Sequence, residues 1–245
     1  MTQGGGGAGV TTRRLLVPSP DGGELSGHLA VPASGSGPGV VVLHEVFGVT
    51  AYVRGVCARL ADLGYVALAP ELYWRLEPEV DIDEASPGGV PRALGLMRRL
   101  DLDLAAGDAG AALRHLRGLE EVGGHKAAVL GFCLGGGIAY LVAARSDPDA
   151  AVSYYARTVP DRLGEAGRVR CPMLFHFGAA DEFIPADRRA AVRHAFAGHT
   201  AEFREHGGAG HAFDNDAMPH LYHAGAAAEA WRQTADFLAR TLYAR

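Results

Sequence analysis

Long apolar runs, an excess of basic residues and a pairable set of cysteines are all missing from this chain of 245 residues. No apolar stretch is long enough to cross a bilayer, so we expect no membrane-spanning segment. A net charge of −5 at neutral pH argues against the basic surface that binds nucleic acid or an acidic membrane. The three cysteines, Cys57, Cys133 and Cys171, cannot all pair and lack zinc-binding spacing. We therefore predict reduced thiols, no metal site and a cytoplasmic location.

The composition is that of an ordinary globular protein. Hydrophobic residues make up 48% of the chain and charged residues 21%, which suits one hydrophobic core. The first residues are mostly glycine and show neither the basic nor the apolar segment of a secretory signal. We predict a flexible Gly-rich tail over residues 1–11 and a single domain over residues 12–245. The expected assembly is a monomer or a weak homodimer.

Strand-like and helix-like segments alternate along the chain. Apolar segments at 15–17 and 25–31 flank the turn Pro20-Asp21-Gly22-Gly23 and predict an antiparallel hairpin. Further strands are expected at 40–43, 65–70, 127–130, 151–155, 173–177 and 201–205, and helices at 52–63, 93–119 with interruptions, 138–144, 186–196 and 226–242. This alternation predicts an α/β fold with a mostly parallel central sheet and helices on both faces.

The most informative segment joins the strand at 127–130 to the following helix. It reads Gly131-Phe132-Cys133-Leu134-Gly135-Gly136, a Gly-x-Cys-x-Gly pattern. The nucleophile elbow of α/β-hydrolases has this form, usually with serine at its apex. The flanking glycines allow close approach of strand and helix, and the helix N-terminus favours a thiolate. We predict an α/β-hydrolase fold with Cys133 as the nucleophile; a buried structural thiol is the alternative.

Partners for such a nucleophile follow in the order that this fold requires, acid and then histidine. Asp181 lies in the loop after the strand at 173–177, and His211 lies in a glycine-rich loop before the last helix. A histidine must receive the thiol proton and return it to the leaving group, and a carboxylate must hold the tautomer of that histidine. The order predicts a Cys-His-Asp triad.

Two backbone amides are candidates for an oxyanion hole. Leu134 directly follows the nucleophile, and Val46 lies in the turn after the strand at 40–43. Glu45 precedes Val46, where a carboxylate would oppose a developing oxyanion. We expect Glu45 to take the thiol proton instead; an ion pair with Arg54 is the alternative.

Four segments together resemble the dienelactone hydrolase family. They are His44–Val49, Gly131–Gly136, Ala180–Pro185 and Gly208–Phe213, with further similarity at 69–73 and at Tyr154-Tyr155. The resemblance implies an α/β-hydrolase with a Cys-His-Asp triad, a glutamate (here Glu45) that activates the cysteine, and no metal or organic cofactor. It also implies a small ester or lactone as substrate and a place in aromatic catabolism, since the namesake enzymes open an enol-lactone to maleylacetate.

The chain departs from the namesake enzymes in its substrate clamp. They carry an arginine four residues after the catalytic histidine, where this chain has Asn215, and a second arginine where it has Val90, with Arg92 nearby. Asp214 and Asp216 add negative charge, so we predict a preference for neutral or weakly anionic substrates unless Arg92 serves as clamp. The residues expected to contact substrate are Phe47, Tyr73, Arg92, Tyr155, Phe213 and Asn215.

A different class of function is compatible with the same sequence. A protein that lost its clamp could bind a ligand without turnover, or sense oxidants through a reactive thiol. His44 and His176 lie at or in predicted strands and are expected to be core histidines.

Overall fold

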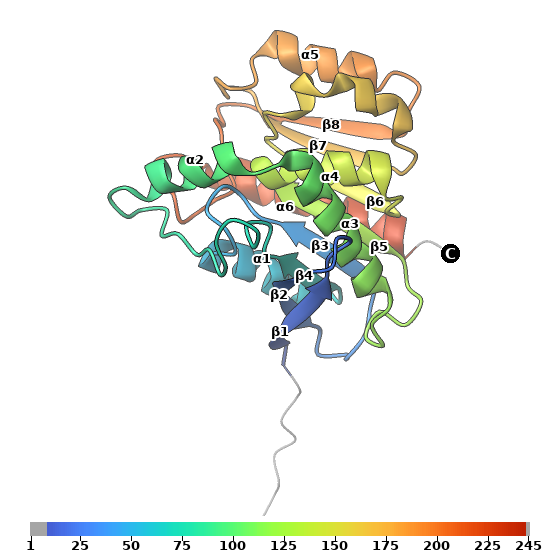
Figure 1. The fold of residues 1–245 in the computed structure, drawn as a ribbon. Coiled ribbons are helices and arrows are strands. Elements are labelled where there is room, and N and C mark those ends of the chain that lie inside the picture. Colours follow the sequence, from blue (N-terminus) through green and yellow to red (C-terminus); the bar gives the residue numbers. More distant parts are fainter. Residues whose placement is uncertain (1–8, 244–245) are drawn as a thin grey trace, which may run out of the picture.

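An eight-stranded sheet organises the computed structural model, which describes residues 9–243 (Figure 1). The strand order is β1-β2-β4-β3-β5-β6-β7-β8. Strand β2 pairs antiparallel with β1 and β4, and the pairs from β4 onward are parallel. The strands are β1 Thr11–Pro18, β2 Glu24–Val31, β3 Gly39–Leu43, β4 Val66–Pro70, β5 Ala127–Phe132, β6 Ala150–Tyr154, β7 Met173–Gly178 and β8 Ala201–His206. The mostly parallel sheet and the hairpin predicted from the sequence are confirmed.

Helices cover both faces of this sheet, as predicted. They are α1 Ala51–Asp62, α2 Gly89–Arg99, α3 Leu102–Arg117, α4 Leu134–Arg145, α5 Ala186–Ala195 and α6 Ala224–Leu242. In Figure 1, α3 and α4 lie in front of the sheet and α6 lies behind it. Helices α1 and α6 meet where the Arg59 guanidinium lies 3.7 Å from the centroid of the Trp231 ring. Every residue of β3 to β7 is buried, because a parallel sheet is covered on both faces.

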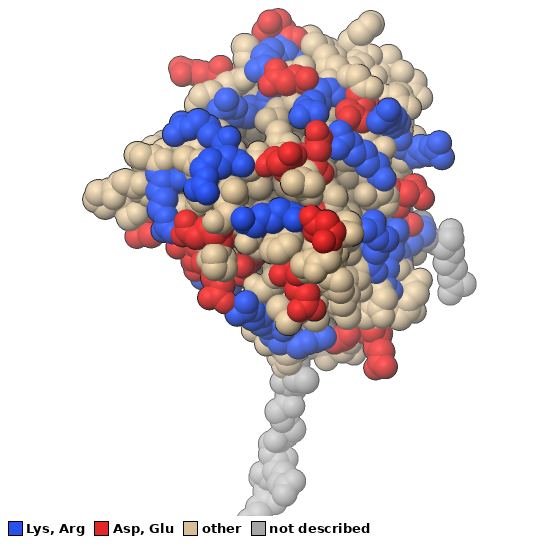
Figure 2. All heavy atoms as spheres, in the orientation of Figure 1, with Lys and Arg blue, Asp and Glu red and all other residues tan. Residues whose placement is uncertain are grey.

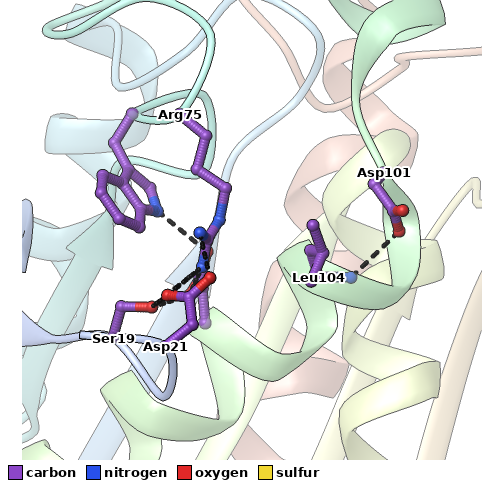
Figure 3. A network of polar contacts seen from close by, with 7 residues as sticks. Ser19, Asp21, Arg75, Asp101 and Leu104 are labelled. Carbon is purple, nitrogen blue, oxygen red and sulfur yellow. Dashed lines mark hydrogen bonds and ion pairs between the residues drawn. The ribbon is translucent and has the colours of Figure 1, made fainter. Parts of the chain in front are cut away.

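Two predicted boundaries gain detail. The helical region 93–119 breaks at Leu100, and Asp101 caps the N-terminus of α3. Its side chain accepts hydrogen bonds from the amides of Asp103 (2.9 Å) and Leu104 (3.1 Å; Figure 3). Strand β1 begins at Thr11, the last residue of the predicted tail, and residues 1–8 of that tail lie outside the described residues.

The surface carries charges of both signs. On the face shown in Figure 2, basic and acidic side chains are interspersed over α2, α3, α4 and α5. Among residues 9–243, no helix combines the length and the apolar character that a membrane span needs.

A buried carboxylate, Asp108, ties the β1–β2 turn to α3 and to the segment after β4. Figure 3 shows Ser19, Asp21 and Arg75 of this network. Asp108 is 1% exposed and accepts hydrogen bonds from Ser19 Oγ (2.8 Å), Trp74 Nε1 (2.8 Å), Arg75 Nε (3.1 Å) and Arg75 Nη2 (2.9 Å). Buried charges of this kind are tolerated because they are paired and hydrogen-bonded. The network fixes the segment that contains Tyr73, whose hydroxyl donates to the Val46 carbonyl (3.1 Å).

We expect the Asp108→Ala variant to lose about 2 kcal/mol of folding free energy, because Trp74 Nε1 and Ser19 Oγ would lose a buried acceptor, while Arg75 would keep its contacts with Asp21. Urea denaturation measures the loss. Asp236→Ala is the control, since the Asp236 carboxylate pairs with Arg232 on the exposed surface of α6 and should cost less than about 1 kcal/mol. Equal costs in the two variants would contradict this account of the network.

Candidate active site

The turn between β5 and α4 is strained at its apex. Cys133 has φ 50° and ψ −109°, a conformation that L-residues rarely adopt and that clusters at functional sites. A Cβ at Gly131 would lie 2.1 Å from the Gly135 carbonyl oxygen, and a Cβ at Gly135 would lie 2.1 Å from the Leu43 carbonyl oxygen. Only glycine therefore permits α4 to start this close to β5 and to the end of β3.

Three side chains predicted as a triad lie in one hydrogen-bonded chain. His211 Nε2 is 3.1 Å from Cys133 Sγ, and His211 Nδ1 is 2.8 Å from Asp181 Oδ2. Asp181 is buried after β7, and its other oxygen accepts the Phe183 amide (2.9 Å). The arrangement can move a proton between sulfur and imidazole while the carboxylate holds the ring.

The electrostatics of His211 favour its protonated form. Burial opposes the imidazolium, but the adjacent Cys133 sulfur and the Asp181 carboxylate outweigh that cost and raise the pKa of His211 to about 10. A protonated imidazole beside the sulfur stabilises a thiolate and can later protonate a leaving group.

The two amides predicted for the oxyanion hole belong to neighbouring turns. Leu134 is the first residue of α4, and Val46 follows β3. The Gly135 amide donates to the His44 carbonyl (3.1 Å), which joins the two turns directly. An oxyanion hole formed by Leu134 and Val46 suits this placement and stays a prediction.

Glu45 lies in the turn after β3, directly before Val46, and is 3% exposed. Its Oε2 accepts a hydrogen bond of 2.5 Å from Asn215 Nδ2, and Asn215 Oδ1 in turn accepts the Ala217 amide (3.0 Å). The ion pair with Arg54 that we considered does not form, because Arg54 contacts Asp81 and the Val49 carbonyl. Burial raises the pKa of Glu45 to about 7, against the opposing effects of Asn215 and His211.

Further buried polar groups surround Glu45. The Tyr155 hydroxyl and Glu84 interact electrostatically with it, and Tyr52 donates to Asp214 Oδ2 at 2.7 Å. Among residues 9–243, one oxygen each of Glu45, Glu84 and Asp214, and the hydroxyl of Tyr155, are buried without a hydrogen-bond partner. Burial raises the pKa of Asp214, against the opposing effect of the hydrogen bond from Tyr52.

The predicted substrate contacts divide into three groups. Tyr155 stands edge-on to His211 with ring centroids 5.4 Å apart, and Phe47 and Tyr73 are buried near the Val46 turn. Phe213 packs edge-on against Tyr155, and both rings are fully buried. Asn215, also fully buried, is engaged with Glu45 and does not face substrate as predicted.

The prediction for Arg92 also needs correction. Its guanidinium pairs with Glu77, and both side chains are largely exposed. The pairing satisfies its charge at the surface, so the structure does not bring Arg92 to the triad. Aromatic Phe183, which was not predicted as a contact, lies 5.1 Å from His211 by ring centroids and is 53% exposed. Its position two residues after the triad acid was the available signal.

Two histidines outside the triad, His44 and His176, have structural partners. His44 donates from Nδ1 to the Glu45 carbonyl (2.6 Å) and accepts the Leu72 amide at Nε2 (3.2 Å). Burial lowers the pKa of His44 to about 4, against the opposing effect of the hydrogen bond to Glu45. His176 lies between His206 and Thr234. Residues 9–243 contain no group of three or more His, Cys, Asp or Glu side chains that could hold a metal ion.

The fold and the triad define an α/β-hydrolase with a cysteine at the nucleophile position. Residues 25–242 match the Dienelactone hydrolase family, and the chain belongs to that family. It is 34% identical over 231 residues to carboxymethylenebutenolidase of Pseudomonas putida, covering 94% of this chain and 97% of the relative. The carboxymethylenebutenolidase of Pseudomonas sp. strain P51 is 35% identical over 212 residues, covering 86% of this chain and 89% of the relative.

Solved structures agree with this assignment. A Klebsiella pneumoniae protein described as a dienelactone hydrolase superposes with a TM-score of 0.82 at 29% identity, covering 94% of this chain and 99% of that one. A dienelactone hydrolase-like promiscuous phosphotriesterase from metagenomic libraries gives 0.78 at 26% identity, with 96% and 99% covered.

We expect Gly135→Ala to destabilise the protein by at least about 2 kcal/mol and to abolish rapid alkylation of Cys133, because the added Cβ would meet the Leu43 carbonyl. Thermal unfolding and iodoacetamide labelling measure both effects. Gly107→Ala on α3 is the control, since no atom lies within 4 Å of its Cβ and alanine favours a helix. A fully reactive Gly135→Ala variant would contradict the packing argument.

Proposed function

We propose that this protein hydrolyses lactones and small carboxylic esters through an acyl-thioester on Cys133. The observation that carries the proposal is the continuous chain Cys133–His211–Asp181 at a strained elbow. The carboxymethylenebutenolidase relatives support a lactone as one substrate. The three buried cysteines are free, which suits a cytoplasmic protein, and we propose a monomer or weak homodimer that takes a small-molecule substrate.

The reaction begins when the Cys133 thiolate attacks the carbonyl carbon of the substrate. The Leu134 and Val46 amides donate to the oxyanion that forms. As the tetrahedral intermediate collapses, the carbon–oxygen bond of the ester breaks and His211 gives its proton to the departing alkoxide. His211 then takes a proton from water, and the resulting hydroxide attacks the thioester. The carbon–sulfur bond breaks to regenerate the thiolate, and the carboxylic acid that leaves gives its proton to solvent.

When Cys133 starts as a thiol, the Glu45 carboxylate accepts its proton. Its carboxylate is held by a neutral amide rather than by a cation. The ionised form is therefore only weakly stabilised, and the group can exchange a proton near neutral pH. Asn215 acts as a positioning residue for this carboxylate.

The alternative of a binding or redox-sensing protein is not favoured. A sensor needs a reactive thiol only, whereas this site also holds His211 between the thiol and a buried carboxylate, as hydrolysis requires.

Substitution of the nucleophile tests the proposal directly. We expect Cys133→Ala to reduce kcat/KM for a short p-nitrophenyl ester and for an enol-lactone by at least about a thousandfold, because no acyl-enzyme can form. The matched control Cys171→Ala alters a free thiol two residues before β7 and should keep the wild-type rate. Wild-type rates in Cys133→Ala would reject the nucleophile.

A pH profile tests Glu45. Its pKa of about 7 means that the carboxylate, the form able to accept a proton, becomes populated as the pH rises through 7. We expect kcat/KM of the wild type to rise over this interval, and the rise to be absent in Glu45→Gln. Glu79→Gln, at an exposed position, is the control. An unchanged ascending limb in Glu45→Gln would assign the titration to another group.

A further inference from the structure

An arginine with no acidic partner among residues 9–243 lies beside an aromatic ring that touches the triad histidine. Arg157 follows β6, and its guanidinium carbon is 5.5 Å from the centroid of the Phe183 ring. The same ring meets His211 edge-on, at an interplanar angle of 80°. Phe183 thus contacts both the guanidinium and the imidazole, and it lies in the loop after β7, the strand that pairs directly with β6 (Figure 1).

Arg157 differs in this respect from two other arginines of the chain. Arg92 is paired with Glu77, and Arg188 is paired with Asp161. Within residues 9–243, no hydrogen bond or ion pair joins the exposed Arg157 side chain to another group. Its paired N–H donors, a geometry that matches carboxylate oxygens, are therefore free for a ligand.

Phe183 adds a second feature that points to a ligand. It is a large aromatic side chain that is more than half exposed although it touches the triad. An exposed ring beside reactive groups offers apolar surface to the hydrocarbon part of a substrate. The cation–π contact holds the guanidinium over that ring. A group that can bind an anion and a surface that can bind a hydrocarbon therefore lie side by side.

We propose that Arg157, supported by Phe183, is the specificity-determining residue that selects esters and lactones carrying a carboxylate. This inference rests on the proposed hydrolase function. It replaces the expectation of a neutral substrate, because Asn215 and Asp214 are buried and engaged with Glu45 and Tyr52. The exposed Glu182 directly precedes Phe183 in the sequence, and it forms no ion pair with Arg157.

The experiment compares kcat/KM for a dienelactone with that for its methyl ester. We expect the wild type to prefer the free carboxylate by about tenfold or more, as the loss of one charge-assisted contact predicts. Arg157→Gln should remove that preference through a higher KM for the carboxylate substrate, while the methyl ester keeps its wild-type rate. Arg157→Lys should retain part of it. Arg232→Gln on α6 makes the same charge change at a paired surface site and should alter neither substrate.

Three results would overturn the inference. They are a wild type without preference, a preference that survives Arg157→Gln, and a preference abolished by Arg92→Gln. None of these touches the proposed function, whose test is the loss of methyl ester hydrolysis in Cys133→Ala. A Cys133→Ala variant that still hydrolyses the methyl ester would instead reject the proposed function, so the two failures are distinguishable.

Discussion

The close approach of the elbow turn to the end of β3 is the constraint on which the site depends. The Gly135 amide binds the His44 carbonyl, and no Cβ fits at Gly135 or Gly131. This contact sets the nucleophile, the first amide of α4 and the Glu45 turn in one fixed relation. Backbone strain at Cys133 is tolerated because the surrounding buried strands and α4 leave the turn no alternative conformation.

A second constraint is the handling of charge behind the nucleophile. Glu45 is buried with a neutral partner, and Tyr155 and Glu84 bring further polar groups close to it. In such surroundings a carboxyl group loses much of its preference for the ionised state. The cationic partner available to Glu45 is His211 itself, so the protonation of base and triad is coupled.

Local patterns made the fold and the triad predictable from the sequence. Continuous apolar runs marked the buried strands, and the two glycines around Cys133 marked a turn that few other residues allow. The order of Asp181 and His211 followed from where a parallel sheet places its loops. Each of these signals lies within a few residues of the group it describes.

The remaining site residues depended on contacts between distant segments. Asn215 and Glu45 are 170 residues apart, so nothing local showed that the amide would turn inward to a buried carboxylate. Asp214 was expected to repel anions, yet Tyr52 covers it from α1. Arg92 is near the expected clamp position in the sequence, but nothing local showed that it would pair with Glu77 at the surface.

Trapping of the acyl-enzyme tests the central claim most directly. The wild type is mixed with a slowly hydrolysed ester, quenched in acid within the first turnover and analysed by peptide mass spectrometry. The account predicts an acyl adduct on the peptide containing Cys133, formed before steady-state product release. An ester that is hydrolysed with burst kinetics and leaves its acyl group on a different residue would contradict it.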